Sequence, residues 1–175
     1  MTPTVYQAAA ARTLPTHEAM TGTLMAAQAS DPRTIPLLMA VLGLAGEIGE
    51  WLAELEGEDV QKQRKEAGDV LWYCAAILTV LGVDMAELPT LPINQIWPPR
   101  ETAKSAPLMA AELVKKAAFH VKDVDTSALV GIVATVVNCI NCVHSSPAKP
   151  ALPEIMAANI AKLQARWPDG FRVCA

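Results

Sequence analysis

Two stretches of the sequence decide the fold: residues 37–55, LLMAVLGLAGEIGEWLAEL, and residues 65–78, KEAGDVLWYCAAIL. In both stretches apolar side chains recur at steps of three and four residues, which is the period of an α-helix. Gly57 and Gly82 follow the two apolar series and are typical of helix ends. The pattern predicts helices over residues 36–56 and 59–81 that pack by their apolar faces. The predicted core positions are Leu38, Val41, Leu42, Ala45, Ile48, Leu52 and Leu55 in the first helix, and Val70, Leu71, Cys74, Ile77, Leu78 and Leu81 in the second.

The rest of the chain continues the helical pattern, interrupted by prolines. Further helices are expected over residues 5–12, 108–121, 126–143 and 153–166, and no stretch alternates in the way of a β-strand. Residues 89–107 contain five prolines and are expected to form a linker along the surface. The expected fold class is therefore all-α, an antiparallel bundle of about six helices that forms one domain over residues 1–175.

The composition is that of a compact protein that buries much of its chain. Of 175 residues, 52% are hydrophobic and 18% are charged, which excludes a disordered chain. The net charge of −4 disfavours a nucleic-acid partner, although a bound divalent cation would still allow a nucleotide to bind. Polar residues interrupt the uncharged stretch at residues 126–148, so we expect a core helix there and no membrane partner. The N-terminal residues do not resemble an export signal, so we expect a cytoplasmic protein with its four cysteines reduced.

Two pairs of acidic residues lie within the two decisive stretches. Glu47 and Glu50 are three residues apart, as are Glu66 and Asp69, so each pair lies on one face of its helix. Apolar residues flank both pairs, and antiparallel packing of the two helices would bring the four carboxylates together. Desolvated anions repel one another, and a hard divalent cation, Mg²⁺ or Mn²⁺, would relieve this repulsion. The two pairs therefore predict a metal centre.

The bare spacing of the acids leaves a second interpretation open, because solvated acid pairs of this kind are common on helix surfaces. Gly46, Gly49 and Gly68 favour the metal centre, since glycine costs a helix about 1 kcal/mol relative to alanine. Their positions beside the acids predict the close approach of a backbone or a ligand. A zinc site is disfavoured, because the CxxC pair of Cys139 and Cys142 lies on an apolar helix and has no second ligand pair.

The acid pairs and their neighbours resemble a known family. Residues 43–50, GLAGEIGE, followed by residues 65–73, KEAGDVLWY, are similar to the MazG-like branch of the all-α nucleoside triphosphate pyrophosphohydrolases, whose signature is ExxE, a spacer and ExxD. Segments near both ends, at residues 6–13 and 159–171, are similar to one MazG-like subfamily. The resemblance implies Mg²⁺-dependent hydrolysis of an NTP or dNTP to the monophosphate and pyrophosphate. Such an activity serves nucleotide-pool control or house-cleaning.

The resemblance also implies roles for individual residues. Glu47, Glu50, Glu66 and Asp69 would bind the metal and take part in catalysis. Glu47 is our choice for the general base, and Glu50 has an equal chemical claim. The residues implied as substrate contacts are Lys115, Lys116, His120, Lys122, Asn159, Lys162 and Arg166.

One departure from the family pattern leads to the hypothesis of a tandem duplication. In the similar subfamily a lysine-containing segment follows the ExxE helix. Here that segment is missing after Leu55, and a matching one, AELVKKAAFHVK, stands at residues 111–122. The hypothesis divides the chain into an acid-bearing half at about residues 1–88, a linker at about 89–107 and a degenerate half at about 108–175.

Under this alignment the second half lacks the acids and each chain would carry one active site. The residues opposite Glu47, Glu50, Glu66 and Asp69 are, in that order, Ser105, Leu108, Ile132 and Thr135. A long divergent insertion is the alternative explanation. Because half of the duplication would have lost its acids, a catalytically silent nucleotide- or metal-binding helical protein is the alternative function. A homodimer is compatible with either function.

Overall fold

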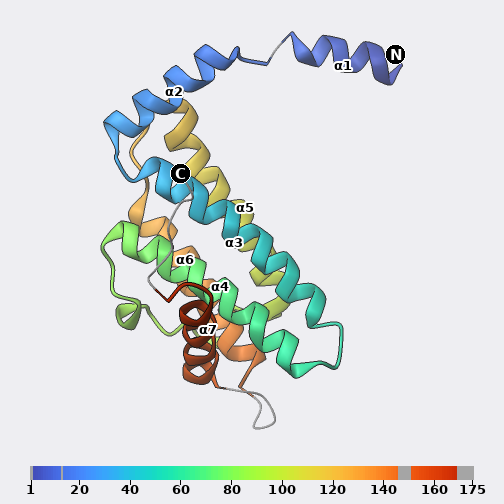
Figure 1. Cartoon of the computed structure of the whole chain (residues 1–175), viewed down its shortest axis with the longest axis vertical. Coiled ribbons are helices and arrows are strands. Elements are labelled where there is room, and N and C mark those ends of the chain that lie inside the picture. Colours follow the sequence, from blue (N-terminus) through green and yellow to red (C-terminus); the bar gives the residue numbers. More distant parts are fainter. Residues whose placement is uncertain (1, 13, 146–150, 169–175) are drawn as a thin grey trace.

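The fold is all-α. The computed structural model describes residues 2–12, 14–145 and 151–168, which contain seven α-helices and, within these ranges, no β-strand (Figure 1). This confirms the fold class, and the number of helices is close to the expected six. The helices are α1 (Pro3–Ala11), α2 (His17–Ser30), α3 (Thr34–Glu54), α4 (Val60–Leu81), α5 (Pro99–His120), α6 (Thr126–Val143) and α7 (Leu152–Arg166), with 3₁₀ turns at Met85–Glu87 and Ile93–Gln95.

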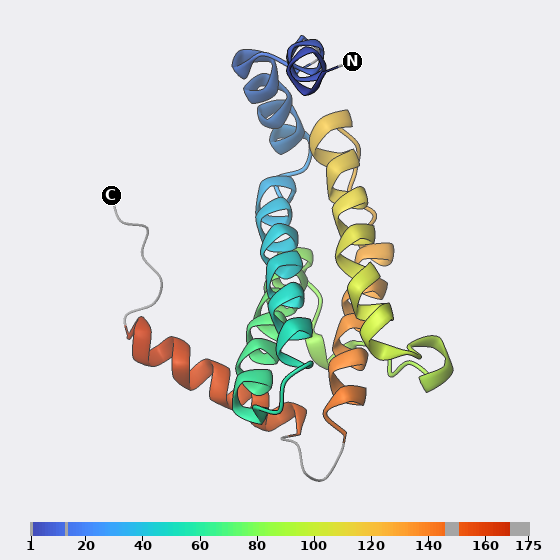
Figure 2. The same ribbon diagram turned by 90° about the vertical axis from the view of Figure 1, so that its right-hand side faces the viewer.

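Four helices form the central bundle. α3 packs against α4 and α5, and α6 packs against α5 and α4, so two helical hairpins, α3–α4 and α5–α6, lie side by side (Figure 2). α3 and α5 run in opposite directions, and Arg100 in the first turn of α5 donates to the carbonyl of Leu55 at the end of α3 at 2.8 Å. α7 packs on α4, and α2 packs on α5 and α3. α1 projects away from the body (Figure 1) and buries none of its residues.

The buried face of α3 agrees in part with the predicted one, since Val41, Ile48 and Leu55 are buried as expected. Leu42 and Ala45, two predicted core positions, are exposed, Leu42 to 63%, whereas Leu44 and Trp51 are fully buried. Because α3 is apolar over most of its circumference, more than one phase of the helical period fits the sequence, and packing against two neighbours selects one. The face predicted for α4 is confirmed, with Val70, Leu71, Cys74, Ile77 and Leu78 buried.

α3 and α6 are the two most apolar helices of the chain. By length and composition alone each could cross a membrane, which is weak evidence, since core helices of soluble proteins meet the same criterion. In this structure both helices contribute buried side chains to the common core. The cytoplasmic location therefore stays a prediction.

The linker expected at residues 89–107 is shorter in the structure. α5 begins at Pro99, so residues 99–107 are helical and the expectation of irregular structure is wrong for them. Pro98 and Pro99 occupy the N-cap and the first helical position, where a missing N–H removes no intrahelical bond. Pro107 lies buried inside α5, where it removes one backbone hydrogen bond without ending the helix.

The connection between the two hairpins (residues 82–98) is held against α6. The side-chain amide of Asn138 donates to the carbonyl of Pro89 at 3.0 Å, and its Oδ1 accepts from the backbone N–H of Leu91 at 3.2 Å. Ile96 is buried in the common core. The connection thus packs along the bundle instead of forming a free tether.

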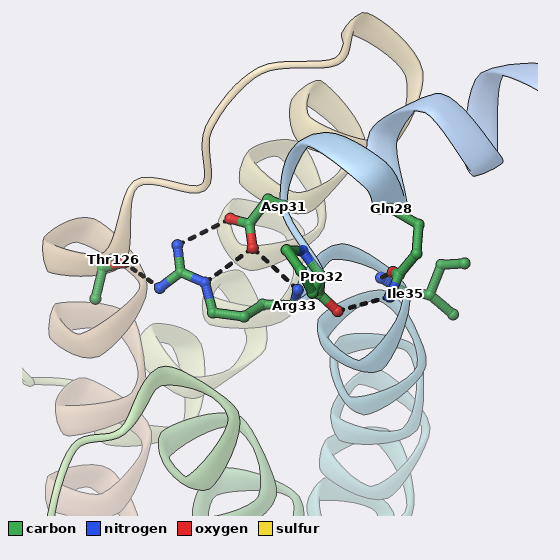
Figure 3. A network of polar contacts seen from close by, with 6 residues as sticks. All are labelled: Gln28, Asp31, Pro32, Arg33, Ile35 and Thr126. Carbon is green, nitrogen blue, oxygen red and sulfur yellow. Dashed lines mark hydrogen bonds and ion pairs between the residues drawn. The ribbon is translucent and has the colours of Figure 1, made fainter.

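A polar network joins the turn between α2 and α3 to the start of α6 (Figure 3). The Arg33 guanidinium donates to both carboxylate oxygens of Asp31, at 2.9 and 2.8 Å, and to Thr126 Oγ1 at 3.3 Å. Gln28 at the end of α2 donates to the carbonyl of Pro32 at 2.8 Å. The hydrogen bond from Arg33 is the main cause that lowers the pKa of Asp31. α2, which the sequence analysis did not predict, is tied to the bundle by this network.

Candidate metal centre

Three of the four predicted acids come together where α3 packs against α4. Glu47 from α3 and Glu66 and Asp69 from α4 each present one carboxylate oxygen, and these oxygens lie within 4.8 Å of one another. Glu66 is buried, with 8% of its surface exposed, and the other two are partly buried. We call these residues the acid cluster. Glu50 is exposed and lies outside this group of three, so the structure does not bring the fourth predicted ligand into it.

The acid cluster is electrostatically strained at Glu47. Burial is the largest cause that raises the pKa of Glu47, and the charges of Asp69, Glu50 and Glu66 raise it further, while Lys65 opposes them. The protonated form of Glu47 is therefore favoured relative to an ordinary glutamate. The mutual repulsion that the sequence predicts is present at this residue.

Two lysines and an amide compensate part of the negative charge. Lys65 Nζ donates to Glu66 Oε1 at 2.5 Å and lies 3.8 Å from Asp69 Oδ2. From α7, Lys162 donates to Asp69 Oδ1, and Asn159 Nδ2 donates to the same oxygen at 2.7 Å. The hydrogen bond to Glu66 is the main cause that raises the pKa of Lys65. These contacts relieve part of the repulsion between the acids without a metal.

One buried oxygen of the cluster has no donor. Glu66 Oε2 is buried and makes no hydrogen bond with any residue that the structure describes. A buried carboxylate oxygen without a partner is costly, and a cation is one species that would satisfy it. The donor set of three carboxylates is the kind that Mg²⁺ and Mn²⁺ prefer. The residues present therefore fit a hard divalent cation.

A glycine on α4 allows α7 to reach the acids. A Cβ added to Gly68 would lie 2.9 Å from the Cβ of Asn159, closer than real side chains approach. A close approach is thus present at this glycine, and the approaching group is the Asn159 side chain instead of the predicted backbone or ligand. Gly46 and Gly49 have open space around them, with no atom of the described residues within 4 Å of an added Cβ, so no backbone approaches them and the approach of a ligand stays a prediction.

A basic pocket of about 160 Å³ adjoins the acid cluster between α4 and α7. Its cationic residues are Arg64, Lys65 and Lys162, and Asn159 also lines it. Arg64 is held in place by a hydrogen bond to the carbonyl of Glu154 at 2.9 Å. Such an arrangement of three cationic side chains beside three carboxylates can bind an anion together with a metal ion. The metal ion would offset part of the negative charge of both the anion and the carboxylates. Sequence reasoning missed Arg64, whose signal is its place two residues before Glu66.

The lysine-containing segment of α5 lies at the other end of the bundle. Arg33, at the start of α3, donates a hydrogen bond to Thr126. The charge of Asp123, which directly follows the lysine-containing segment, contributes to raising the pKa of Arg33. Glu47 stands 14 residues after Arg33 and hence about 21 Å further along the helix axis. Within one chain the structure therefore places His120 and Lys122 far from the acids, and Lys115, seven residues before Lys122, about 10 Å closer to them along the axis. The four predicted substrate contacts of this segment are all exposed: Lys115, Lys116, His120 and Lys122. Lys115 pairs with Glu112 at 3.2 Å instead.

The three remaining predicted substrate contacts lie on α7, and only two of them reach the acids. Asn159 and Lys162 contact the acid cluster, whereas the Arg166 guanidinium lies over the ring of Trp167, 4.5 Å from its centroid.

Burial raises the pKa of the Cys139 thiol to about 11, so this thiol stays protonated at neutral pH and is a poor zinc ligand.

The comparisons with known proteins add no further assignment. No protein-family model matches the chain, and no curated protein and no solved structure matches it. The family resemblance therefore rests on the sequence motifs, and the site rests on its own geometry.

Proposed function

We propose that this chain is a Mg²⁺-dependent nucleoside triphosphate pyrophosphohydrolase. The observation that carries the proposal is the meeting of Glu47, Glu66 and Asp69 within 4.8 Å beside a pocket lined by cations. Carboxylates are the protein ligands of Mg²⁺, and lysine and arginine are the usual partners of phosphate oxygens. The resemblance to MazG-like enzymes supports the same assignment, with an NTP or dNTP as substrate.

Each residue has a role in the proposed reaction. Glu66 and Asp69 would hold the cation, which would supply charge neutralisation for the triphosphate and acidify a water molecule. Lys65 and Lys162, which contact these acids, would bind the phosphate oxygens of the substrate. Glu47 would accept a proton from the attacking water, because its carboxylate lies beside those of Glu66 and Asp69.

Pyrophosphate release tests this function. The purified chain is incubated with Mg²⁺ and a panel of canonical and modified NTPs and dNTPs, and product formation is measured for each. We expect turnover of at least one substrate, and a loss of about 100-fold or more for Glu66→Gln, as for other groups that stabilise transition-state charge. The matched control is Glu101→Gln, which neutralises an exposed acid on α5 and should leave the rate unchanged.

A silent binding protein is the second candidate. The contacts of Lys65 and Lys162 favour it, because they already stabilise two of the acids without a metal. Mn²⁺ binding followed by electron paramagnetic resonance separates the candidates. Mn²⁺ binding that Glu66→Gln abolishes, together with no turnover on the whole panel, would favour the silent protein and exclude the enzyme.

A further inference from the structure

We propose that the groove between α5 and α6 binds an uncharged, mostly apolar small molecule with a hydrogen-bond donor. This groove has a volume of about 410 Å³ and lies on the other hairpin from the acid cluster. Pockets that take small molecules have volumes of roughly 300–1,000 Å³. We call it the neutral groove. Its occupant follows from the chemistry of its walls.

The walls of the neutral groove carry no charge. Met109 and Leu113 on α5 and Ile132 on α6 supply apolar surface, and the remaining lining residues are alanine, glycine, serine and threonine. A charged ligand would lose water there without gaining a counter-charge, which disfavours it. Met109 is 57% exposed at this site, and its flexible thioether adapts to ligands of different shape.

Three hydroxyl groups give the groove its polarity. Thr102, Ser105 and Thr135 each donate to a carbonyl of their own helix, to Pro98 at 3.1 Å, Thr102 at 2.9 Å and Gly131 at 2.9 Å. Their protons are thus engaged, and each hydroxyl oxygen of these lining residues keeps a lone pair that can accept a hydrogen bond. A ligand with an N–H or O–H group would satisfy these oxygens, which is why the proposal includes a donor.

The groove is open at Gly131. An added Cβ on Gly131 would meet no atom within 4 Å, so the helix surface there is open. Under the duplication alignment, Ser105, Ile132 and Thr135 are the counterparts of Glu47, Glu66 and Asp69. The hollow therefore stands at the place where the other hairpin gathers its acids. The binding proposal depends on the groove and not on the duplication.

Fluorescence titration with N-phenyl-1-naphthylamine tests the proposal, because this probe is neutral, largely apolar and carries one N–H. We expect saturable binding of one probe per chain. The anionic relative 1-anilinonaphthalene-8-sulfonate should bind at least tenfold more weakly. Binding that does not saturate, or equal affinity for the two probes, would overturn the proposal.

Two variants locate the probe. Gly131→Leu fills the groove from α6 and should weaken binding at least tenfold, whereas Gly22→Leu, the same change at an open glycine of α2, should not. Ser105→Leu fills the groove from the opposite wall and should act like Gly131→Leu, with circular dichroism confirming that each variant is folded. Unchanged binding in both groove variants refutes the site. Sedimentation tests one further outcome that would contradict the proposal. If Gly131→Leu turns a dimer into a monomer, the groove is an interface between copies of the chain.

Discussion

The two helical hairpins of this bundle have different surface chemistry. In α3–α4, three carboxylates meet, and α7 contacts them with Asn159 and Lys162. In α5–α6, the surface carries a groove with hydroxyl and apolar walls and no charge. Both hairpins bury apolar side chains in one common core. The common core specifies the fold, and a few outward positions set the surface chemistry of each hairpin.

The largest expected effect concerns which lysines serve the acids. Lys162→Met should lower kcat/KM for pyrophosphate release by about 100-fold, or about 2.7 kcal/mol, because it removes a cation beside the triphosphate site. Lys115→Met should leave kcat/KM within about twofold, because Lys115 is exposed and pairs with Glu112 instead of the acid cluster. Steady-state kinetics of the two variants is the measurement. The opposite ranking would mean that a second copy of the chain brings its α5 lysines to the acids.

A smaller effect is expected from two glycines that differ in their surroundings. Gly68→Ala should lower the free energy of unfolding by about 1–3 kcal/mol, because its Cβ would collide with Asn159 and push α7 away. Gly131→Ala should raise it by up to about 1 kcal/mol, because it gains helix propensity and meets no atom. Urea unfolding of both variants checks the pair. Equal effects would show that α7 does not press on α4 in solution.

The smallest effect is a dependence on pH at Glu47. Since the pKa of Glu47 is raised in the folded state, the folded protein binds more protons than the unfolded chain between the ordinary value of 4.5 and the raised value. Stability without metal should therefore fall as pH rises through this window, and Glu47→Gln should remove that fall and slightly raise the melting temperature at pH 7. Mg²⁺ should stabilise the wild type more than the variant, which keeps Glu66 and Asp69. A variant less stable than the wild type at pH 7 without Mg²⁺ would make Glu47 a structural partner.

The sequence predicts some parts of the fold closely and others poorly, for physical reasons. α4 and α6 have one clear apolar face, and their predicted bounds match to within a residue. α2 escaped prediction because it buries only Ala27 among its residues and so carries no apolar stripe. The start of α5 was missed because proline is compatible with a first helical turn, and Pro107 with a helix interior that the neighbours support.

The candidate site was predictable where it depends on one helix or one hairpin. Glu66 and Asp69 share a face of α4, and the hairpin brings Glu47 to them, as the spacing predicts. The positions of the α5 lysines depend on the direction of α5 against α3, which no local pattern encodes. The pairing of Lys65 with Glu66 was missed for a different reason. Adjacent residues on a helix usually diverge, and here the long lysine side chain bends back to its neighbour.

The packed connection at residues 82–98 changes how the two hairpins meet. Because it joins them covalently, their encounter is intramolecular, at an effective concentration on the order of millimolar. Two separate hairpins would come apart on dilution, whereas this pair stays together at any protein concentration. Neither surface has to be self-complementary, so a substitution on one hairpin is not repeated on the other, as it would be in a symmetric dimer. One hairpin can therefore keep its acids while the other is free to acquire a different ligand.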